Sequence, residues 1–298
     1  MPRGTPLFGP SGNSESFYTE GYKHTWEAFA WLSQKKLSAF EYSFGRGVTM
    51  TEEYAALIKR ESQQNGIAVS AHAPYYVSLA NPDISVREKS IRWILEAAQR
   101  LLWMGGQRLV VHVGSVLKME RSEAISRSVE GLQEVLRRLE DLGRNVSLCI
   151  ETMGKPGQIG TLDEILSFCA KDERLIPCID FAHLHAIGGG TLNQTEDFAL
   201  VLDRAEDALG RQRAKNMHIH FSTVEYGAGG EKRHRTFADT EYGPRFDQLA
   251  PLLCRREYTP VIICESRGSM AEDAQSMLAS WTNCVPQKRA GRQISLQQ

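Results

Sequence analysis

Three observations predict that this chain folds as a single (β/α)8 barrel. Eight short apolar, β-rich runs alternate strictly with amphipathic segments of helical period, a pattern typical of parallel strands joined by crossover helices. The length of 298 residues and the hydrophobic content of 42% are sufficient for the core of one such barrel. An open doubly wound sheet would carry a G-x-G-x-x-G fingerprint after its first strand, and Phe8-Gly9-Pro10-Ser11-Gly12 lacks that spacing.

The expected strands are Pro6–Gly9, Ala39–Phe44, Ile67–Ala73, Arg108–Gly114, Val146–Thr152, Leu175–Phe181, Asn216–Ser222 and Pro260–Ser266. The expected helices are Phe17–Gln34, Glu52–Asn65, Ser85–Met104, Ser122–Leu142, Thr161–Lys171, Thr195–Arg213, Phe246–Arg256 and Ala271–Thr282. Capping-box spacing marks two helix starts, at Ser85 with Glu88 and at Thr161 with Glu164. We assign residues 1–283 to the barrel, and we expect the aperiodic tail 284–298 to be disordered.

Composition limits the classes of partner. With 35 Lys+Arg against 36 Asp+Glu the net charge is −1, so no bulk charge favours a polyanion. The six cysteines form no C-x-x-C motif, and several lie in expected strands, which indicates reduced core thiols and a cytoplasmic protein. No stretch is apolar and long enough for a secretion signal or a membrane span, so we expect no membrane partner.

The expected strands end in acidic and imidazole residues. His72, His112, Glu151, Asp180, His218 and Glu265 each fall near the carboxyl end of a strand, and His183 follows Asp180 by three residues. In a closed parallel barrel these ends meet at one rim, where active sites form. Any one of these residues alone is explained by a buried salt bridge or hydrogen bond. Several carboxylates converging on one rim would repel one another unless cations or protons intervene, so the set indicates a metalloenzyme.

Other residues near the rim have open interpretations. By the period-two rule, His218 and His220 share one strand face. Tyr75 and Tyr76 are either ordinary loop packing or a pair that stacks on bases. The run Lys232-Arg233-His234-Arg235 is either a local basic patch or a solvated loop.

At these residues the chain resembles the endonuclease IV family of abasic-site nucleases, within the xylose-isomerase-like barrels. The motifs that carry the resemblance are Ser70-Ala-His72-Ala-Pro-Tyr75, His112-Val-Gly114-Ser115, Glu151-Thr-Met-Gly154, Asp180-Phe-Ala-His183, His218-Ile-His-Phe-Ser222, Arg233-His234 and Ile263-Cys-Glu265. Each motif is weak by itself, but the ordered set extends over most of the chain.

The resemblance implies a cluster of two or three zinc ions, or manganese, and a metal-bound hydroxide that attacks DNA 5′ to an abasic site. The implied metal ligands are His72, His112, Glu151, Asp180, His183, His218, His234 and Glu265. Glu151 would bridge metals and Glu265 would position the attacking water, which makes both catalytic. Implied substrate contacts are Tyr75, Tyr76, Arg46, Lys232, Arg233 and His220.

The chain departs from the family pattern near its last histidine. The family has an Asp two residues before this His, whereas here Lys232 precedes His234 and Glu231 is one position out of phase. Because a protonated lysine cannot bind zinc, we expect Lys232 to contact substrate phosphate and the third metal to be weakly held.

Two enzymatic hypotheses and one non-enzymatic hypothesis follow. The favoured one is a hydrolase of phosphodiester bonds in abasic DNA, in a repair role. The alternative is an isomerase or epimerase of a small sugar or sugar phosphate, with one divalent metal held by Glu151, Asp180, His218 and Glu265. His72, His112 and His234 separate the two, because an isomerase does not need them. The third hypothesis is a barrel that binds a ligand or partner at its rim without turnover. This hypothesis does not explain the large number of residues of metal-ligand type.

Overall fold

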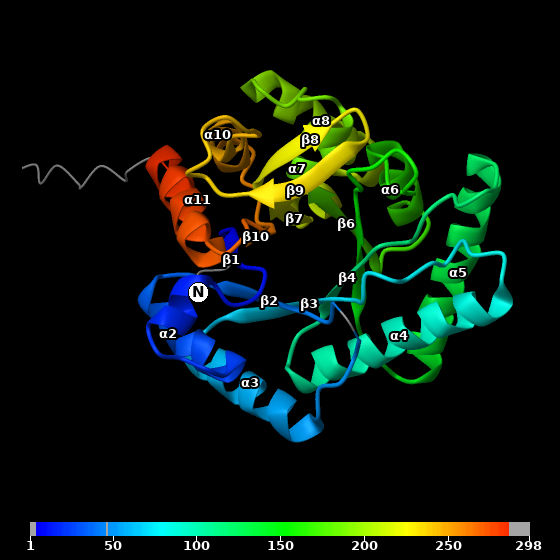
Figure 1. Ribbon diagram of the computed structural model, residues 1–298, viewed down its shortest axis with the longest axis horizontal. Coiled ribbons are helices and arrows are strands. Elements are labelled where there is room, and N and C mark those ends of the chain that lie inside the picture. The colour runs from blue at the N-terminus through cyan, green and yellow to red at the C-terminus, as the bar shows by residue number, and fades with distance from the viewer. Residues whose placement is uncertain (1–3, 46, 286–298) are drawn as a thin grey trace, which may run out of the picture.

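Eight parallel strands follow one another around a closed barrel in the computed structural model, which describes residues 4–45 and 47–285. The strands are β1 (Leu7–Pro10), β2 (Ala39–Ser43), β3 (Ala68–His72), β4 (Arg108–Val111), β5 (Ser147–Glu151), β6 (Leu175–Asp180), β7 (His218–Phe221) and β10 (Val261–Cys264). From β2 onward each pairs with the next of these strands, and β10 pairs with β1 (Figure 1). The predicted (β/α)8 barrel is confirmed.

The junction between β1 and β2 closes the barrel. The backbone N–H of Ser38 donates to the carbonyl of Phe8 at 2.8 Å, and that of Gly12 donates to the carbonyl of Glu41 at 2.9 Å. Gly9 permits this approach, since a Cβ there would lie 1.7 Å from the Ala39 carbonyl oxygen. The glycine is therefore a requirement of barrel closure.

The helices are α1 (Glu15–Thr19), α2 (Ala28–Gln34), α3 (Glu52–Asn65), α4 (Ile84–Trp103), α5 (Arg121–Asp141), α6 (Leu162–Cys169), α7 (Phe181–Ile187), α8 (Thr195–Leu209), α9 (Arg211–Lys215), α10 (Phe246–Arg255) and α11 (Met270–Cys284), with a 3₁₀ turn η1 (Thr25–Glu27). The single helices expected at 17–34 and 195–213 are each divided, the second at Gly210. Of the two capping boxes, the one at Thr161 and Glu164 is confirmed. The one at Ser85 is wrong, because Asp83 caps α4 and accepts from the Ser85 N–H at 2.8 Å.

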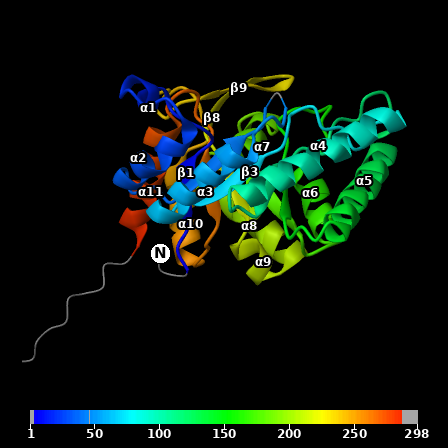
Figure 2. The ribbon, with the colours of Figure 1, turned by 90° about the horizontal axis from the view of Figure 1, so that it is seen from below.

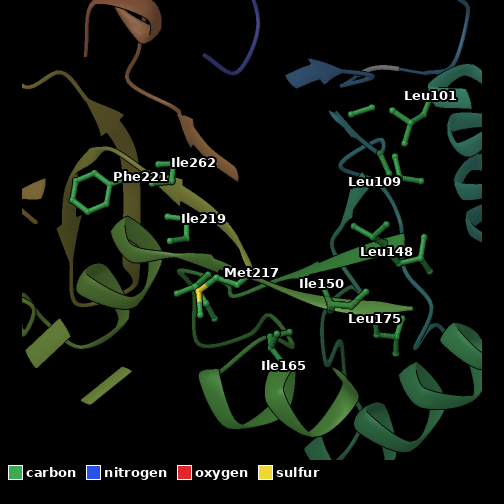
Figure 3. Packing of buried hydrophobic residues seen from close by; sticks show 14 of the residues in the cluster. Leu101, Leu109, Leu148, Ile150, Ile165, Leu175, Met217, Ile219, Phe221 and Ile262 are labelled. Atoms are coloured by element: carbon green, nitrogen blue, oxygen red, sulfur yellow. The ribbon is translucent and has the colours of Figure 1, made fainter. Parts of the chain in front are cut away.

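Successive side chains of each barrel strand point in turn toward the surrounding helices and into the barrel. Leu148 and Ile150 of β5 belong to the apolar cluster between strands and helices, and Leu148 lies beside Leu175 of β6 (Figure 3). Cys149 and Glu151, on the opposite face of the same strand, point into the barrel. The apolar core thus lies between strands and helices. Polar side chains such as Glu151 occupy the barrel interior at the carboxyl ends of the strands.

Two elements were not predicted, and both contribute to the site. Helix α7 begins directly after β6, and the antiparallel hairpin of β8 (Thr223–Gly227) and β9 (Gly230–Arg235) follows β7. Figure 2 shows this hairpin over the end of the barrel opposite to α9. The tail expected to be disordered lies outside the described residues from position 286 onward, whereas Cys284 ends α11. No helix among the described residues is long and apolar enough to cross a membrane.

Candidate metal centre

Glu151, the last residue of β5, is surrounded by four imidazoles. Its Oε2 lies 3.1 Å from His72 Nε2 and 2.7 Å from His112 Nε2, and its Oε1 lies 3.2 Å from His220 Nδ1 and 3.5 Å from His183 Nδ1. The carboxylate is 1% exposed. Burial raises its pKa, but the imidazoles of His112 and His220 outweigh burial and hold the pKa well below its usual range. Glu151 is therefore an anion at the centre of a nitrogen-rich cluster.

Three overlapping groups of ligand-type atoms converge around Glu151, each with its atoms within 4.8 Å of one another. They are His72 with His112 and Glu151; Glu151 with Asp180, His220 and Glu265; and Asp180 with His183 and His234. Glu151 belongs to the first two groups and Asp180 to the last two. Carboxylates shared between adjacent groups are typical of sites that hold two or more cations.

The start of helix α7 orients two members of the third group, Asp180 and His183. Asp180 caps this helix by accepting from the His183 N–H at 2.9 Å, while the His183 ring Nδ1 lies 2.8 Å from the Thr152 carbonyl oxygen. The ring therefore turns Nε2 toward Glu231, whose Oε2 is 3.4 Å away. Burial lowers the pKa of His183, but Asp180, Glu231 and Glu151 outweigh burial and raise it to about 10.

A β-bulge brings Glu231 beside His234. In the hairpin register Glu225 faces Arg233 and Tyr226 faces Glu231, so the intervening Lys232 is an extra residue on its strand. The extra residue shifts the side-chain alternation by one, and Glu231 Oε1 lies 3.8 Å from His234 Nε2. The hydrogen bond to His183 lowers the pKa of Glu231 to about 2. Glu231 is one position out of phase in the sequence, but the bulge absorbs the odd residue and brings its carboxylate beside His234.

His218 and His220 are exchanged relative to expectation. His220, predicted as a substrate contact, is 0% exposed and lies among Glu151, Asp180 and Glu265, so it cannot touch substrate. His218, predicted as the ligand from β7, lies one layer deeper, with its Nε2 3.0 Å from Glu41 Oε2. The period-two rule placed both residues on one face but did not show which one reaches the rim.

Glu41 was not identified from the sequence. It sits in the middle of β2, is 0% exposed and accepts a hydrogen bond from Ser70 Oγ at 2.8 Å. A signal existed, since a carboxylate stands at an inward position of a strand expected to be buried. Its position in the middle of the strand, and not at the carboxyl end, separates it from the pattern that marks the rim residues.

The remaining predicted residues lie around the mouth of the site. Tyr75 and Tyr76 are 56% and 66% exposed, and the Tyr75 ring lies 5.3 Å from the His72 ring. Lys232 and Arg233 point toward Glu225, at 3.8 and 2.8 Å, on the hairpin. Arg46 lies outside the described residues.

An open cavity of about 650 Å³ connects these groups. Its lining includes the first-group residues His72, His112 and Glu151, together with Glu231, His234 and Glu265. Lys155, Lys232, Arg233 and Arg267 stand on its walls. The cavity lining thus combines metal-ligand side chains with four cationic side chains.

The donor set fits divalent zinc, which binds imidazole nitrogen and carboxylate oxygen. Asp180 Oδ2 is buried and accepts no hydrogen bond from any described residue, and the nearby His183 Nδ1, at 3.3 Å, is directed to the Thr152 carbonyl. A buried carboxylate oxygen without a hydrogen bond is costly unless a cation neutralises it. The residues that would hold such ions are His72, His112, Glu151, Asp180, His183, His220, Glu231, His234 and Glu265.

Sequence comparison identifies two informative relatives. The chain is 38% identical over 236 residues to an uncharacterized protein of Methanocaldococcus jannaschii, and the match covers 79% of this chain and 84% of that protein. It is 31% identical over 194 residues to a protein of Bacillus subtilis called probable endonuclease 4, with 63% of this chain and 62% of that protein covered. The match to the second relative thus spans less than two thirds of its length.

Structural comparison finds the same fold in an endonuclease and in an epimerase-like protein. Endonuclease IV from Thermus thermophilus superimposes with a TM-score of 0.69 at 21% identity, covering 94% of this chain and 98% of that chain. A D-tagatose 3-epimerase-like protein superimposes with a TM-score of 0.70 at 16% identity and the same coverage. At these identities the likeness establishes the fold alone. The family described as "Xylose isomerase-like TIM barrel" matches residues 29–282, and the chain therefore belongs to that family, with probable endonuclease 4 proteins among its relatives.

Proposed function

We propose that this protein is a metal-dependent phosphodiesterase that cleaves DNA 5′ to abasic sites. One observation carries the proposal: three ligand groups overlap through Glu151 and Asp180. His72, His112 and His234 complete two of these groups, and a mononuclear site has no use for them. The relatedness to probable endonuclease 4 of Bacillus subtilis supports the same interpretation.

The bound ions would polarise the phosphate and lower the pKa of a water nucleophile. Around them the chain's own residues have distinct tasks. Glu265 faces the cavity, with its Oε1 3.5 Å from His220 and its Oε2 3.7 Å from His234, where it can orient a water and accept its proton. Lys155 and Arg267 on the cavity walls favour approach of a phosphate.

A second candidate is a sugar or sugar-phosphate isomerase with one metal. The observation in its favour is the group of Glu151, Asp180, His220 and Glu265, which alone satisfies a four-coordinate ion. This set differs from the expected quartet in that His220 replaces His218. The isomerase assigns no task to His72 and His112 at the other side of Glu151.

Metal content and strand nicking separate the two candidates. Protein purified with zinc or manganese present should hold at least two ions per chain, because the described ligand atoms exceed the needs of one. It should nick a duplex containing one abasic site on the 5′ side and leave the undamaged duplex intact. A single ion per chain, with epimerisation of ketosugars and no nicking, would establish the isomerase instead.

The exposed tyrosines give a second test. Removal of both rings in Tyr75→Ala/Tyr76→Ala should weaken binding to abasic duplex by about 10-fold or more, because extrahelical placement of a nucleotide costs a few kcal/mol that an inserted ring offsets. Zinc content should remain at the wild-type level. Binding is measured by fluorescence anisotropy, with Leu200→Ala on α8 as the control, since Leu200 is 63% exposed and is not part of the cavity lining. Unchanged affinity in the double variant would assign the tyrosines to loop packing.

A further inference from the structure

The loop between β5 and α6 brings two polar side chains to the cavity that are not metal ligands, Lys155 and Gln158. Lys155 is exposed and makes no ion pair with any residue that the structure describes. In contrast, Lys232 and Arg233 of the hairpin both pair with Glu225. The loop therefore supplies the cavity with a cation that has no carboxylate at ion-pair distance within the described part of the chain.

The side-chain amide of Gln158 has no partner either. Its Oε1 is buried, and neither end of the amide forms a hydrogen bond with any residue within 4–45 and 47–285. A buried polar atom without a hydrogen bond is destabilising. Because Gln158 lines the cavity, a bound molecule can satisfy this amide, and the amide nitrogen can donate to an anion.

Arg121 fixes the backbone of this loop. Its Nη1 donates to the Pro156 carbonyl at 3.0 Å, and its Nη2 donates to the Gln158 carbonyl at 3.0 Å. Glu164 holds the same guanidinium, with its Oε1 2.6 Å from Arg121 Nε. Lys155 and Gln158 are therefore presented by a backbone that is in place before a substrate binds, which lowers the entropic cost of binding.

The loop also contacts the hairpin at the third ligand group. The Glu231 N–H donates to the Gly154 carbonyl at 2.9 Å. A Cβ at Gly230 would lie 2.1 Å from the same carbonyl oxygen, so this close approach requires glycine. Lys155 follows Gly154 directly in the chain, and both Lys155 and Glu231 line the cavity. An anion bound by Lys155 is therefore adjacent to the proposed metal centre.

We infer that Lys155 and Gln158 form a phosphate subsite for a phosphate of the substrate strand other than the one that is cleaved. The Lys155 ammonium neutralises this phosphate, and the Gln158 amide donates a hydrogen bond to it. Lysine and glutamine side chains are frequent phosphate partners in protein–DNA complexes. The inference rests on the proposed function and assigns the subsite a role in binding, not in the chemical step.

The test of Lys155 measures affinity for a duplex with one abasic site over a range of salt concentrations. Each phosphate that a protein neutralises contributes about −0.9 to the slope of log K against log salt concentration. Lys155→Gln should therefore weaken binding and make this slope less steep by about 0.9. Lys171→Gln is the control, because Lys171 is exposed beyond the end of α6 and does not line the cavity. The control should keep the wild-type slope.

Gln158 is tested by two variants in the same assay. Gln158→Leu removes the hydrogen bond and should weaken binding about 10-fold at an unchanged salt slope, since no charge is lost. Gln158→Glu keeps the shape of the side chain, but its charge repels a phosphate, so binding should weaken further than in Gln158→Leu. Gln64→Leu, at an exposed position of α3 outside the cavity lining, is the control. Thermal midpoints close to wild type establish that each variant is folded.

An unchanged salt slope in folded Lys155→Gln would overturn the inference. So would affinity of Gln158→Leu within twofold of wild type, or binding by Gln158→Glu that is no weaker than by Gln158→Leu. Wild type that neither nicks nor binds the abasic duplex would refute the proposed function, and the inference with it. Wild type that nicks this duplex while the loop variants bind as it does would refute the inference alone.

Discussion

Glu265→Gln is expected to lower the rate of abasic-site cleavage by at least about 100-fold, equivalent to about 2.7 kcal/mol of barrier. Glu265 follows β10, belongs to the second ligand group and lines the cavity beside Ser266. The amide keeps the shape of the side chain but cannot accept a proton and carries no charge to hold a water. The backbone N–H of Glu265 donates to the Phe221 carbonyl at 3.1 Å, and the variant retains this bond, so the strand end should keep its place.

Single-turnover cleavage at saturating protein measures this loss apart from substrate binding. The thermal midpoint should stay close to wild type, and elemental analysis should find most of the metal retained, because the other eight candidate ligands are unchanged. Glu123→Gln, at an exposed ion pair with Arg127 on α5, is the matched control for loss of one carboxylate. A rate within tenfold of wild type, about 1.4 kcal/mol or less, would exclude Glu265 from the reaction.

Glu151→Ala is expected to remove most bound metal and to lower the free energy of unfolding by about 3 kcal/mol even without metal. The second effect follows because removal of one partner from a buried ion pair leaves the other uncompensated. In this protein the carboxylate lies within 3.5 Å of four imidazoles, so the cost falls on several groups at once.

Denaturant unfolding in the presence of a chelator measures the loss in free energy of unfolding that does not depend on metal. Glu164→Ala serves as control, because this carboxylate pairs with Arg121 and caps α6. The control should lose stability but keep its metal. Glu151→Ala with wild-type metal content would show that the three ligand groups do not depend on a shared carboxylate.

The barrel was predictable because its strands and helices repeat a simple pattern. Expected and observed strand bounds agree within a few residues, since apolar runs of fixed length end at turns. Helix α7 escaped prediction because it starts without a linker after β6, where Asp180 is both the last strand residue and the helix cap. A helix of seven residues also shows too little periodicity to detect.

The site was predictable in its residue types but less so in its geometry. Positions at strand ends fix which residues approach the rim, and Glu151 with its neighbours follows that rule. The choice between His218 and His220 depends on how far β7 is shifted along the barrel axis, and this shift leaves no mark in a period-two pattern. The approach of Glu231 depends on a bulge that only the pairing of β8 with β9 determines.

Glu231 and His234 lie on a hairpin that is separate from the barrel sheet. The hairpin forms a sheet of its own and touches the barrel loop through the Glu231 N–H, which donates to the Gly154 carbonyl at 2.9 Å. Insertions and exchanges there leave barrel closure untouched. Under the proposed function, exchange of a few hairpin residues would add or withdraw one cation, so the number of bound ions could change while the barrel scaffold stays the same.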